Sequence, residues 1–117
     1  MPMKTIAAAF VLMVLAMPAA RADPLRDEIA HLLDFIRSSS CTFIRNEEEH
    51  SGKAAADHIE DKYDYYRDEI KTVEDFIERA ASRSSMSGKP YQVRCDGKTM
   101  PAADWLRGEH ANYQATH

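Results

Sequence analysis

Two cysteines, Cys41 and Cys95, supply the only covalent cross-link that this sequence offers. They lie downstream of an N-terminal segment with the composition of a secretory signal peptide. Lys4 precedes an almost unbroken apolar run from Ile6 to Met17, and Ala20-Arg21-Ala22 places small residues before a cleavage point. The run is too short for a resident membrane helix. We therefore predict that residues 1–22 are a cleaved signal peptide and that residues 23–117 are exported.

In an oxidising compartment two lone thiols usually pair, so we expect a structural disulfide between Cys41 and Cys95. A reactive or metal-binding thiol pair is the alternative, but a redox site usually needs a C-x-x-C spacing that is absent here. Closing a loop of about 54 residues contributes about 4 kcal/mol in the chain-entropy model. No cysteine follows the predicted cut, and no other segment approaches membrane-spanning length. We expect no membrane anchor.

The exported part is small and acidic. The full chain has 15 Lys and Arg and 19 Asp and Glu, and without Lys4 and Arg21 the net charge becomes −6 with histidine neutral. Such a balance opposes binding to nucleic acid or to anionic lipid, which need concentrated Lys and Arg. The length fits one domain with a modest core. We expect a single domain over residues 23–117, monomeric or weakly oligomeric, with no nucleic-acid partner.

Apolar spacing predicts about four helices. The first runs from Pro24 to about Arg37 after an Asp23 cap, and a long one runs from Gly52 to about Lys71 after Ser51. Thr72 and Asp75 resemble a capping box, so a third helix restarts there, although a single long bent helix is the alternative. The last runs from about Ala102 to Tyr113. The residues expected to face the core are Leu25, Ile29, Leu32, Leu33, Ile36, Ala55, Ala56, Ile59, Tyr63, Tyr66, Ile70, Val73, Phe76, Ile77, Ala80, Trp105, Leu106 and Tyr113.

Two short hairpins complete the predicted fold. Residues 41–45 are β-prone and turn at Asn46 into residues 47–50, and residues 91–95 turn at Asp96-Gly97 toward Thr99-Met100. The fold class is α+β, mostly helical with about four helices, with two short β-hairpins tied by one disulfide. A Cys41–Cys95 bond implies that the hairpins lie side by side, with the helices packed on one face.

Several stretches resemble the YfeK-like family of small exported bacterial proteins, which carry a domain of unknown function. They are TFIRN at residues 42–46, the helix beginning at Ser51, KTVEDFIERAASRSSMSGKPYQVR at residues 71–94, and ADWL at residues 103–106. The resemblance implies a periplasmic protein of Gram-negative bacteria and brings no activity, substrate or catalytic residue. Two departures from the expected pattern are Asn46-Glu47 in place of Asn-Gly, and Ala102, which has no side-chain oxygen to cap the last helix.

Candidate chemistry is sparse. Gly88-Lys89 lacks the other residues of a phosphate loop, because Arg83 and Pro90 stand where glycine and Ser or Thr are needed. His58, Asp61 and Tyr65 are expected on the face of the long helix opposite its core stripe, where a metal site is weighed against an ordinary solvated face and the solvated face is favoured. An aromatic groove where Tyr91 and Trp105 flank the disulfide is weighed against core packing, which is favoured.

These observations favour a non-enzymatic periplasmic protein that binds an envelope protein or component. The proposed contact is Glu47-Glu48-Glu49-His50 on the first hairpin, which could meet a basic partner, although a solvated turn explains the same residues. No catalytic, cofactor or metal residue is predicted. Two alternatives stay open. One is an acid- or envelope-stress protective holdase, suggested by five histidines and 19 carboxylates that gain positive charge on acidification. The other is a small periplasmic enzyme or hydrolase inhibitor.

Overall fold

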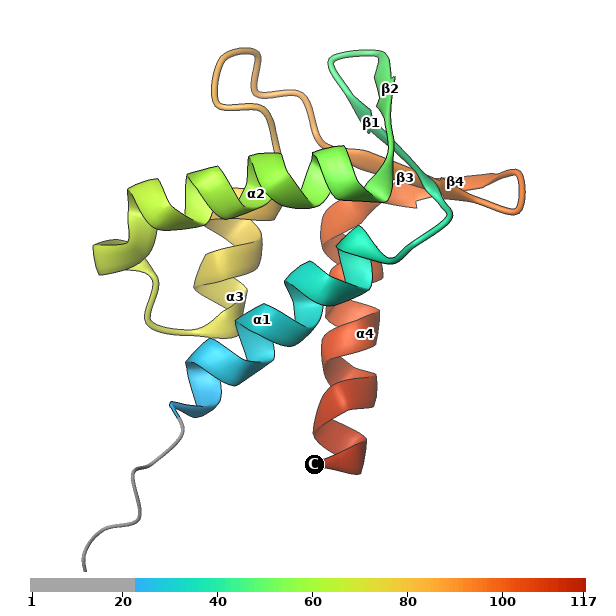
Figure 1. Ribbon diagram of the computed structural model, residues 1–117. Coiled ribbons are helices and arrows are strands. Elements are labelled where there is room, and N and C mark those ends of the chain that lie inside the picture. The colour runs from blue at the N-terminus through green and yellow to red at the C-terminus, as the bar shows by residue number, and fades with distance from the viewer. Residues whose placement is uncertain (1–22) are drawn as a thin grey trace, which may run out of the picture.

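The computed structural model describes residues 23–117, so the predicted signal peptide lies outside the described residues. Along the described residues a helix, a hairpin, two helices, a second hairpin and a last helix follow one another (Figure 1). The helices are α1 (Pro24–Arg37), α2 (Gly52–Tyr66), α3 (Val73–Phe76) and α4 (Ala102–Thr116), and the strands are β1 (Thr42–Arg45), β2 (Glu48–His50), β3 (Gln92–Cys95) and β4 (Lys98–Pro101). The predicted α+β class, with four helices and two hairpins, is confirmed.

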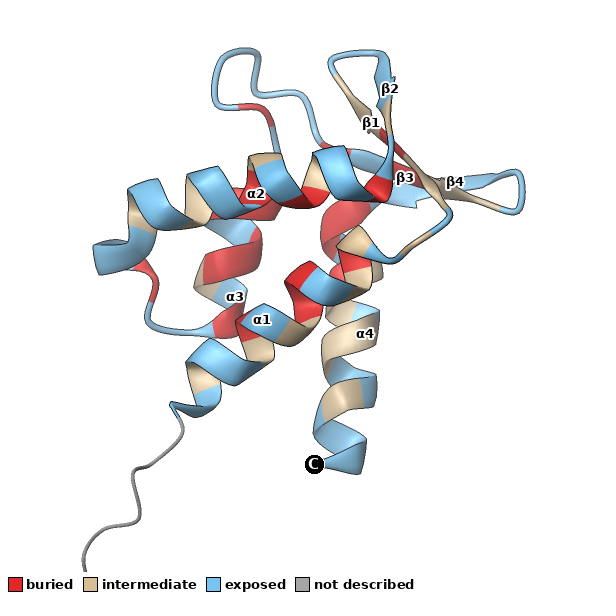
Figure 2. Ribbon diagram, viewed as in Figure 1, coloured by how far each residue is buried: buried red, intermediate tan, exposed pale blue. Residues whose placement is uncertain are grey.

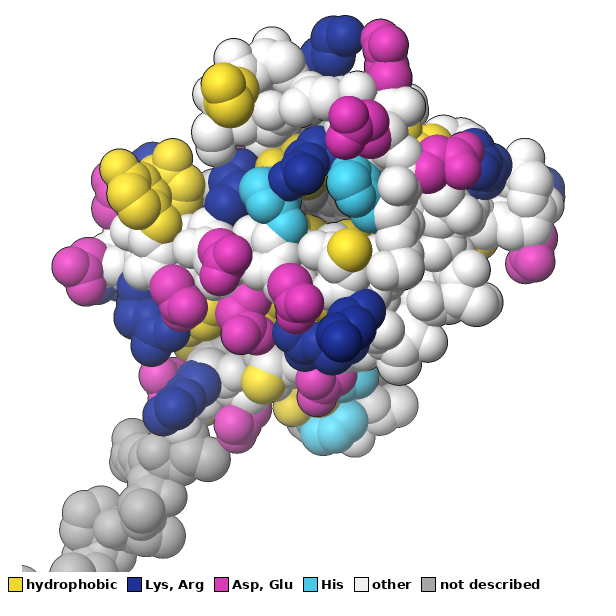
Figure 3. Space-filling model, turned by 45° about the horizontal axis from the view of Figure 1, so that its top comes forward, with side chains coloured by type: hydrophobic (Ala, Val, Ile, Leu, Met, Phe, Trp, Pro, Cys, Tyr) yellow, Lys and Arg dark blue, Asp and Glu magenta, His cyan; other side chains and the backbone are white. Residues whose placement is uncertain are grey.

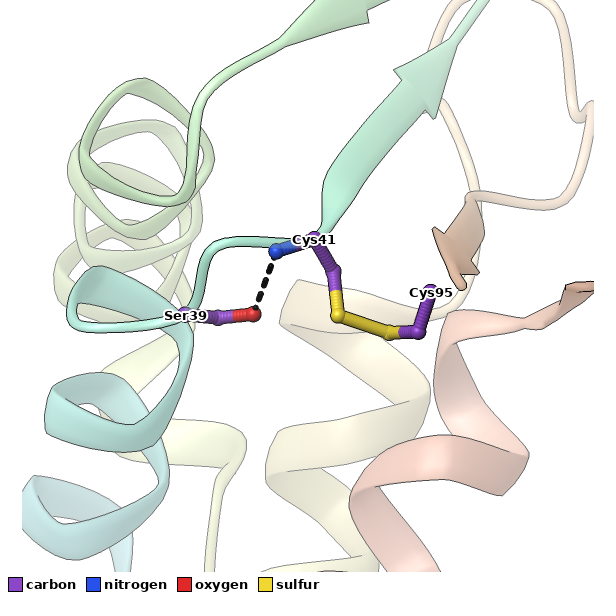
Figure 4. The surroundings of a disulfide bond; sticks show 3 residues. All are labelled: Ser39, Cys41 and Cys95. Atoms are coloured by element: carbon purple, nitrogen blue, oxygen red, sulfur yellow. Dashed lines mark hydrogen bonds between the residues drawn. A yellow bond between two sulfur atoms is a disulfide. The ribbon is translucent and has the colours of Figure 1, made fainter. Parts of the chain in front are cut away.

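The two hairpins form one antiparallel sheet in the order β2-β1-β3-β4. The central pair is β1 with β3, in a register that places Thr42 opposite Arg94. Cys41 directly precedes β1 and Cys95 ends β3, so the two cysteines lie across from each other. They form a disulfide with Cα atoms 4.7 Å apart, and the Cys41 amide donates to the Ser39 hydroxyl at 3.0 Å (Figure 4). The predicted disulfide and the side-by-side hairpins are confirmed.

The core lies where the helices meet the sheet, and Figure 2 shows the buried residues on the facing sides of the helices. On α1, Asp23 caps the helix as expected, and Ile29, Leu32, Leu33 and Ile36 are buried. From the sheet, Phe43 and Val93 face each other across β1 and β3 and join the same core. Trp105 of α4 packs against Phe35 and Phe43, with ring centroids 4.4 and 5.4 Å away.

The second helix is shorter than predicted. It begins at Gly52 with Ser51 as its cap but ends at Tyr66, not near Lys71. Arg67–Glu69 form a tight 3₁₀ turn, and Ile70 is extended, with φ −98° and ψ 105°. This bend turns the Ile70 side chain into the core, where it is 4% exposed. The extended backbone then leads into Thr72, which is the N-cap of α3. An N-cap residue needs this extended conformation.

The capping box of α3 is present as predicted, so the single long bent helix is wrong. The Thr72 hydroxyl accepts from the Asp75 amide at 3.0 Å, and the Asp75 carboxylate accepts from the Thr72 amide at 3.2 Å. Sequence spacing did not predict that the helix then widens into a π-helical turn over Ile77–Ala81. The Ser82 hydroxyl donates to the Ile77 carbonyl at 2.7 Å, which satisfies the buried hydroxyl at the end of this turn.

Polar pairs and backbone contacts position the ends of the helices. His31 of α1 lies 2.8 Å from the Glu109 carboxylate of α4, and His110 of α4 reciprocally contacts Glu28 of α1. At the start of α4 no side chain caps the helix, and the Ala102 amide instead donates to the Tyr91 carbonyl at 2.9 Å. Over residues 23–117, no helix is both long and apolar enough to cross a membrane.

Candidate functional site

A pocket between α2 and the first hairpin, called here the α2–β1 pocket, is the best-formed hollow on the described surface. It has about 40 Å³ of room. Its apolar lining is Phe43, Ile44, Ala54, Ala55, Ile59 and Ala102, and its polar lining is Arg45, His50, His58, Tyr91 and Gln92. Figure 3 shows the hollow on the surface, with histidine side chains on both sides of it and Lys or Arg side chains beside its rim.

Three polar side chains interlock at one wall of the pocket. The Tyr91 hydroxyl lies 3.1 Å from Nε2 of His58 and accepts a hydrogen bond from Lys62 Nζ at 3.2 Å. Lys62 also donates to the Arg83 carbonyl at 2.8 Å. An ammonium group can only donate, so the Tyr91 proton is available to Nε2 of neutral His58. The three groups are therefore mutually satisfied.

Burial and neighbouring cations determine the protonation of this cluster. Burial, with help from the Arg45 and Lys62 charges, lowers the pKa of His58 below its ordinary value of 6.5. Burial and Arg45 likewise lower the pKa of Lys62. Burial raises the pKa of the Tyr91 phenol above 10.0. At neutral pH this favours a neutral imidazole and a protonated phenol, which fits the hydrogen bond between them.

Arg45 and His50, which also line the pocket, lack such partners among the described residues. Within residues 23–117, Arg45 forms no ion pair, although its cross-strand neighbour is Glu48. The Glu48 carboxylate instead lies 3.9 Å from Nε2 of His50, too far for a hydrogen bond. This Nε2 atom is buried and has no hydrogen-bond partner in the described part of the chain. A buried polar atom without a partner costs about 1–3 kcal/mol, so the site favours a group that supplies one.

The three residues predicted on the solvated face of the long helix differ in their exposure to solvent. Asp61 and Tyr65 are exposed, Tyr65 at 81%. The expectation fails for His58, which is half-buried and bonds Tyr91 across the pocket. The helix is flanked by the β1–β2 hairpin, which covers one side of the face that spacing alone assigned to solvent.

The acidic run Glu47-Glu48-Glu49 is exposed on the first hairpin, and two of its members are paired within the chain. Glu47 lies 3.1 Å from Lys89 Nζ, and Glu49 lies 2.6 Å from the Arg94 guanidinium. His50 faces the pocket rather than extending this acidic surface. A contact between the run and a basic partner stays a prediction.

The Gly88-Lys89 segment lies in a loop beside the first hairpin. Gly88 has φ +71° and donates its amide to the Ser84 carbonyl, in the loop that follows the helical segment ending at Ala81. The side chain of Asn46 holds this loop, since its amide group contacts Ser84 at 3.2 Å and Ser87 at 2.5 Å. Among the described residues, no group of three or more His, Cys, Asp or Glu side chains gathers in a metal-binding arrangement.

Reasoning from the sequence missed most of the α2–β1 pocket. The sequence does not single out Arg45, Lys62 and Tyr91 together, because they come from β1, from α2 and from the position just before β3. One usable signal was the spacing of His58 and Lys62, four residues apart on one helix face. Core packing is the favoured prediction for both aromatic residues: Tyr91 is buried with 6% exposure, and Trp105 is partly buried against the core. Tyr91 lines the α2–β1 pocket, whereas the Trp105 ring packs against Phe35 and Phe43.

Comparison with known proteins gives a family but no activity. A family model described as a family of unknown function (DUF5329) matches residues 23–114. The uncharacterized protein YfeK of Salmonella typhimurium strain LT2 is 36% identical over 92 residues, which cover 76% of this chain and 77% of that protein. No solved structure matches. The resemblance to the YfeK-like family is thereby confirmed over nearly all described residues.

Proposed function

This chain belongs to DUF5329, a family of unknown function, and we propose that it is a non-enzymatic binding protein of the periplasm. In this proposal the α2–β1 pocket holds an anionic group of an envelope component. The observation that carries it is the pair of unengaged groups at the pocket, the Arg45 guanidinium and the buried Nε2 of His50. In the proposal Nε2 of His50 carries the ring proton, and a guanidinium beside such an N–H donor is a suitable site for a carboxylate or a phosphate.

The disulfide supports the proposed periplasmic location. Structural disulfides persist in oxidising environments, among them the bacterial periplasm, and are rare in the cytosol. The Cys41–Cys95 bond is therefore consistent with export, as the signal-peptide prediction for residues 1–22 requires.

The state of the pocket residues supports binding over catalysis. A tyrosine acting as a general base needs a lowered pKa, whereas burial raises the pKa of Tyr91. His58 lies near Asp61, but within the described residues no hydrogen bond joins them, so no carboxylate orients the imidazole as in a triad. Both cysteines are consumed by the disulfide. The pocket groups thus suit holding an anion more than reacting with one.

The test is a titration of the disulfide-bonded protein with acetate and with inorganic phosphate, followed by NMR of the His50 side chain and the backbone amides. We expect a saturable shift with at least one anion and a loss of affinity of about tenfold or more in Arg45→Gln, because one charge-assisted pair is worth about 1.5–3 kcal/mol. Lys53→Gln is the matched control, since Lys53 is an exposed α2 cation that does not line the pocket. Equal loss in both variants, or no saturable shift with either anion, contradicts the proposal.

A further inference from the structure

The lining of the α2–β1 pocket limits the size and polarity of the ligand atoms that are attached to the anionic group. Most of the lining residues are apolar, including Phe43, Ile44 and Ile59, and the room is about 40 Å³. One water-sized probe occupies roughly 10–15 Å³ in this measure, so the space suits about three water-sized groups. The accessible lining surface is mostly apolar, so an alkyl group placed against it buries apolar surface. The pocket therefore fits a methyl or ethyl group beside the anion.

The donor side chains that remain without a partner indicate which anionic group fits the pocket. His58, Tyr91 and Lys62 already satisfy one another, and Lys62 also bonds the Arg83 carbonyl. Among the described residues, Arg45 and His50 remain as donor side chains without a partner in the pocket, and the exposed Gln92 amide is a further donor in its lining. The N–H groups of a guanidinium form a planar fork that pairs particularly well with the two oxygens of a carboxylate. A phosphate group would bring further oxygens against apolar walls, where unpaired polar atoms are costly.

We infer that the ligand of the α2–β1 pocket is a carboxylate whose adjoining carbon carries an apolar group of methyl or ethyl size. This inference rests on the proposed function and narrows it. The shared chemistry occurs in two sources, a free short-chain acid and the C-terminal alanine of a peptide. In both, Arg45 and His50 hold the carboxylate while the alkyl group contacts Ala54, Ala55 and Ile59.

The experiment compares five probes by NMR titration of the disulfide-bonded protein: propionate, N-acetyl-L-alanine, N-acetyl-D-alanine, propionamide and inorganic phosphate. We expect propionate or an N-acetylalanine to bind at least tenfold more tightly than propionamide and phosphate. Tighter binding of an N-acetylalanine than of propionate identifies a peptide terminus as the source, and the reverse identifies a free acid.

A pocket-filling variant tests where the alkyl group sits. Ala54 is exposed and lines the pocket, so Ala54→Leu is expected to fold and to weaken carboxylate binding about tenfold or more. Ala111→Leu is the matched control, an exposed alanine on α4 that does not line the pocket. Thermal unfolding of both variants reports whether they fold.

The outcomes separate this inference from the proposed function. Phosphate binding more tightly than every carboxylate overturns the inference and leaves anion binding in place. Unchanged carboxylate affinity in a folded Ala54→Leu protein also overturns the inference alone. Propionamide binding as tightly as the tightest of the three carboxylate probes overturns both, as does the absence of a saturable shift with any probe.

Discussion

Nε2 of His58 lies 3.1 Å from the hydroxyl oxygen of Tyr91, which joins α2 to the residue that precedes β3. Burial and two nearby cations lower the pKa of this imidazole, so its neutral form is favoured in the folded protein. The charged and titratable groups around it are Arg45, Lys62, Asp61, His50 and Tyr91. Of these, Asp61 alone raises the pKa, and its effect is smaller than that of burial, Arg45 or Lys62.

We predict that His58 makes the protein less stable as the pH falls below 6.5. Because its pKa is lower in the folded state than in the unfolded state, the unfolded chain takes up the proton first. The stabilising contribution is complete above 6.5 and is lost as the pH falls from 6.5 through the folded pKa. Each unit of pKa difference is worth about 1.4 kcal/mol. Urea unfolding at about pH 7 and pH 5 measures the effect.

His58→Gln is the comparison, because glutamine can still bond Tyr91 and does not titrate. The variant should lose less stability than the wild type between the two pH values. The other four histidines are present in both proteins, so their contributions cancel in the difference. An identical pH dependence in the two proteins contradicts the prediction.

Tyr91→Phe should destabilise the protein by about 1–3 kcal/mol, because His58 loses its partner and Lys62 loses one of its two acceptors near the protein interior. Urea unfolding at neutral pH gives the free energy of unfolding. Tyr65→Phe is the matched control, since the Tyr65 side chain is 81% exposed and should change stability by less than about 0.5 kcal/mol. Similar effects of the two substitutions would mean that the Tyr91 hydroxyl has no special role.

Gly52→Ala should destabilise the protein by about 1–3 kcal/mol or more, because backbone must move to admit the new methyl group. A Cβ atom at Gly52 would lie 2.3 Å from the Ile36 carbonyl oxygen and 2.8 Å from that of Ser39. The N-terminus of α2 therefore approaches the end of α1 in a way that only glycine permits. Thermal or urea unfolding measures the loss.

Gly108→Ala is expected to have the opposite effect. A Cβ atom at Gly108 meets nothing within 4 Å, and alanine in a helix interior is more favourable than glycine by about 0.5–1 kcal/mol. Both variants replace a helical glycine by alanine, so the difference in their stability changes reports the close backbone approach at Gly52 rather than the general helix preference of alanine. If both substitutions stabilise the protein, the claim that only glycine fits at position 52 is wrong.

Glu47→Gly should be more stable than Glu47→Gln by about 0.5–1 kcal/mol. Asn46 and Glu47 both have positive φ, 51° and 69°, which is the conformation of a type I′ hairpin turn and favours glycine at the second position. The exposed ion pair with Lys89 that is lost contributes about 1 kcal/mol at most. Glu47→Gln is the control, because it removes the charge and keeps the backbone preference. A lower free energy of unfolding for Glu47→Gly than for Glu47→Gln contradicts the prediction.

Loss of the Cys41–Cys95 disulfide should cost about 4 kcal/mol in the chain-entropy model, because the closed loop spans about 54 residues. Cys41→Ala and Cys95→Ala should each be destabilising, and the double variant should cost little more than either, since all three lose the same bond. Mass spectrometry of an unreduced digest checks the pairing. Two alkylatable thiols, or a Cys41–Cys41 peptide between chains, would contradict it.

Much of the fold could be predicted because the signals are local. Asp23, Ser51 and the Thr72–Asp75 pair cap their helices through hydrogen bonds within four residues, so the sequence contains both partners. On α1, Ile29, Leu32, Leu33 and Ile36 recur at helical spacing and are buried as predicted, whereas Leu25 is only partly buried. The disulfide followed from export and from the count of cysteines.

The tertiary structure alone decided the features that join distant segments. Ile70 leaves the helical pattern because burial in the core and the following cap outweigh one more turn of helix. His58 faces a pocket rather than solvent because the first hairpin folds against α2. Arg45, His50 and Tyr91 meet there because β1 pairs with β3, a register that depends on contacts about fifty residues apart along the chain. Local propensity is encoded in neighbouring residues, whereas a binding site depends on which segments pack together, and that packing is decided only when the whole core forms.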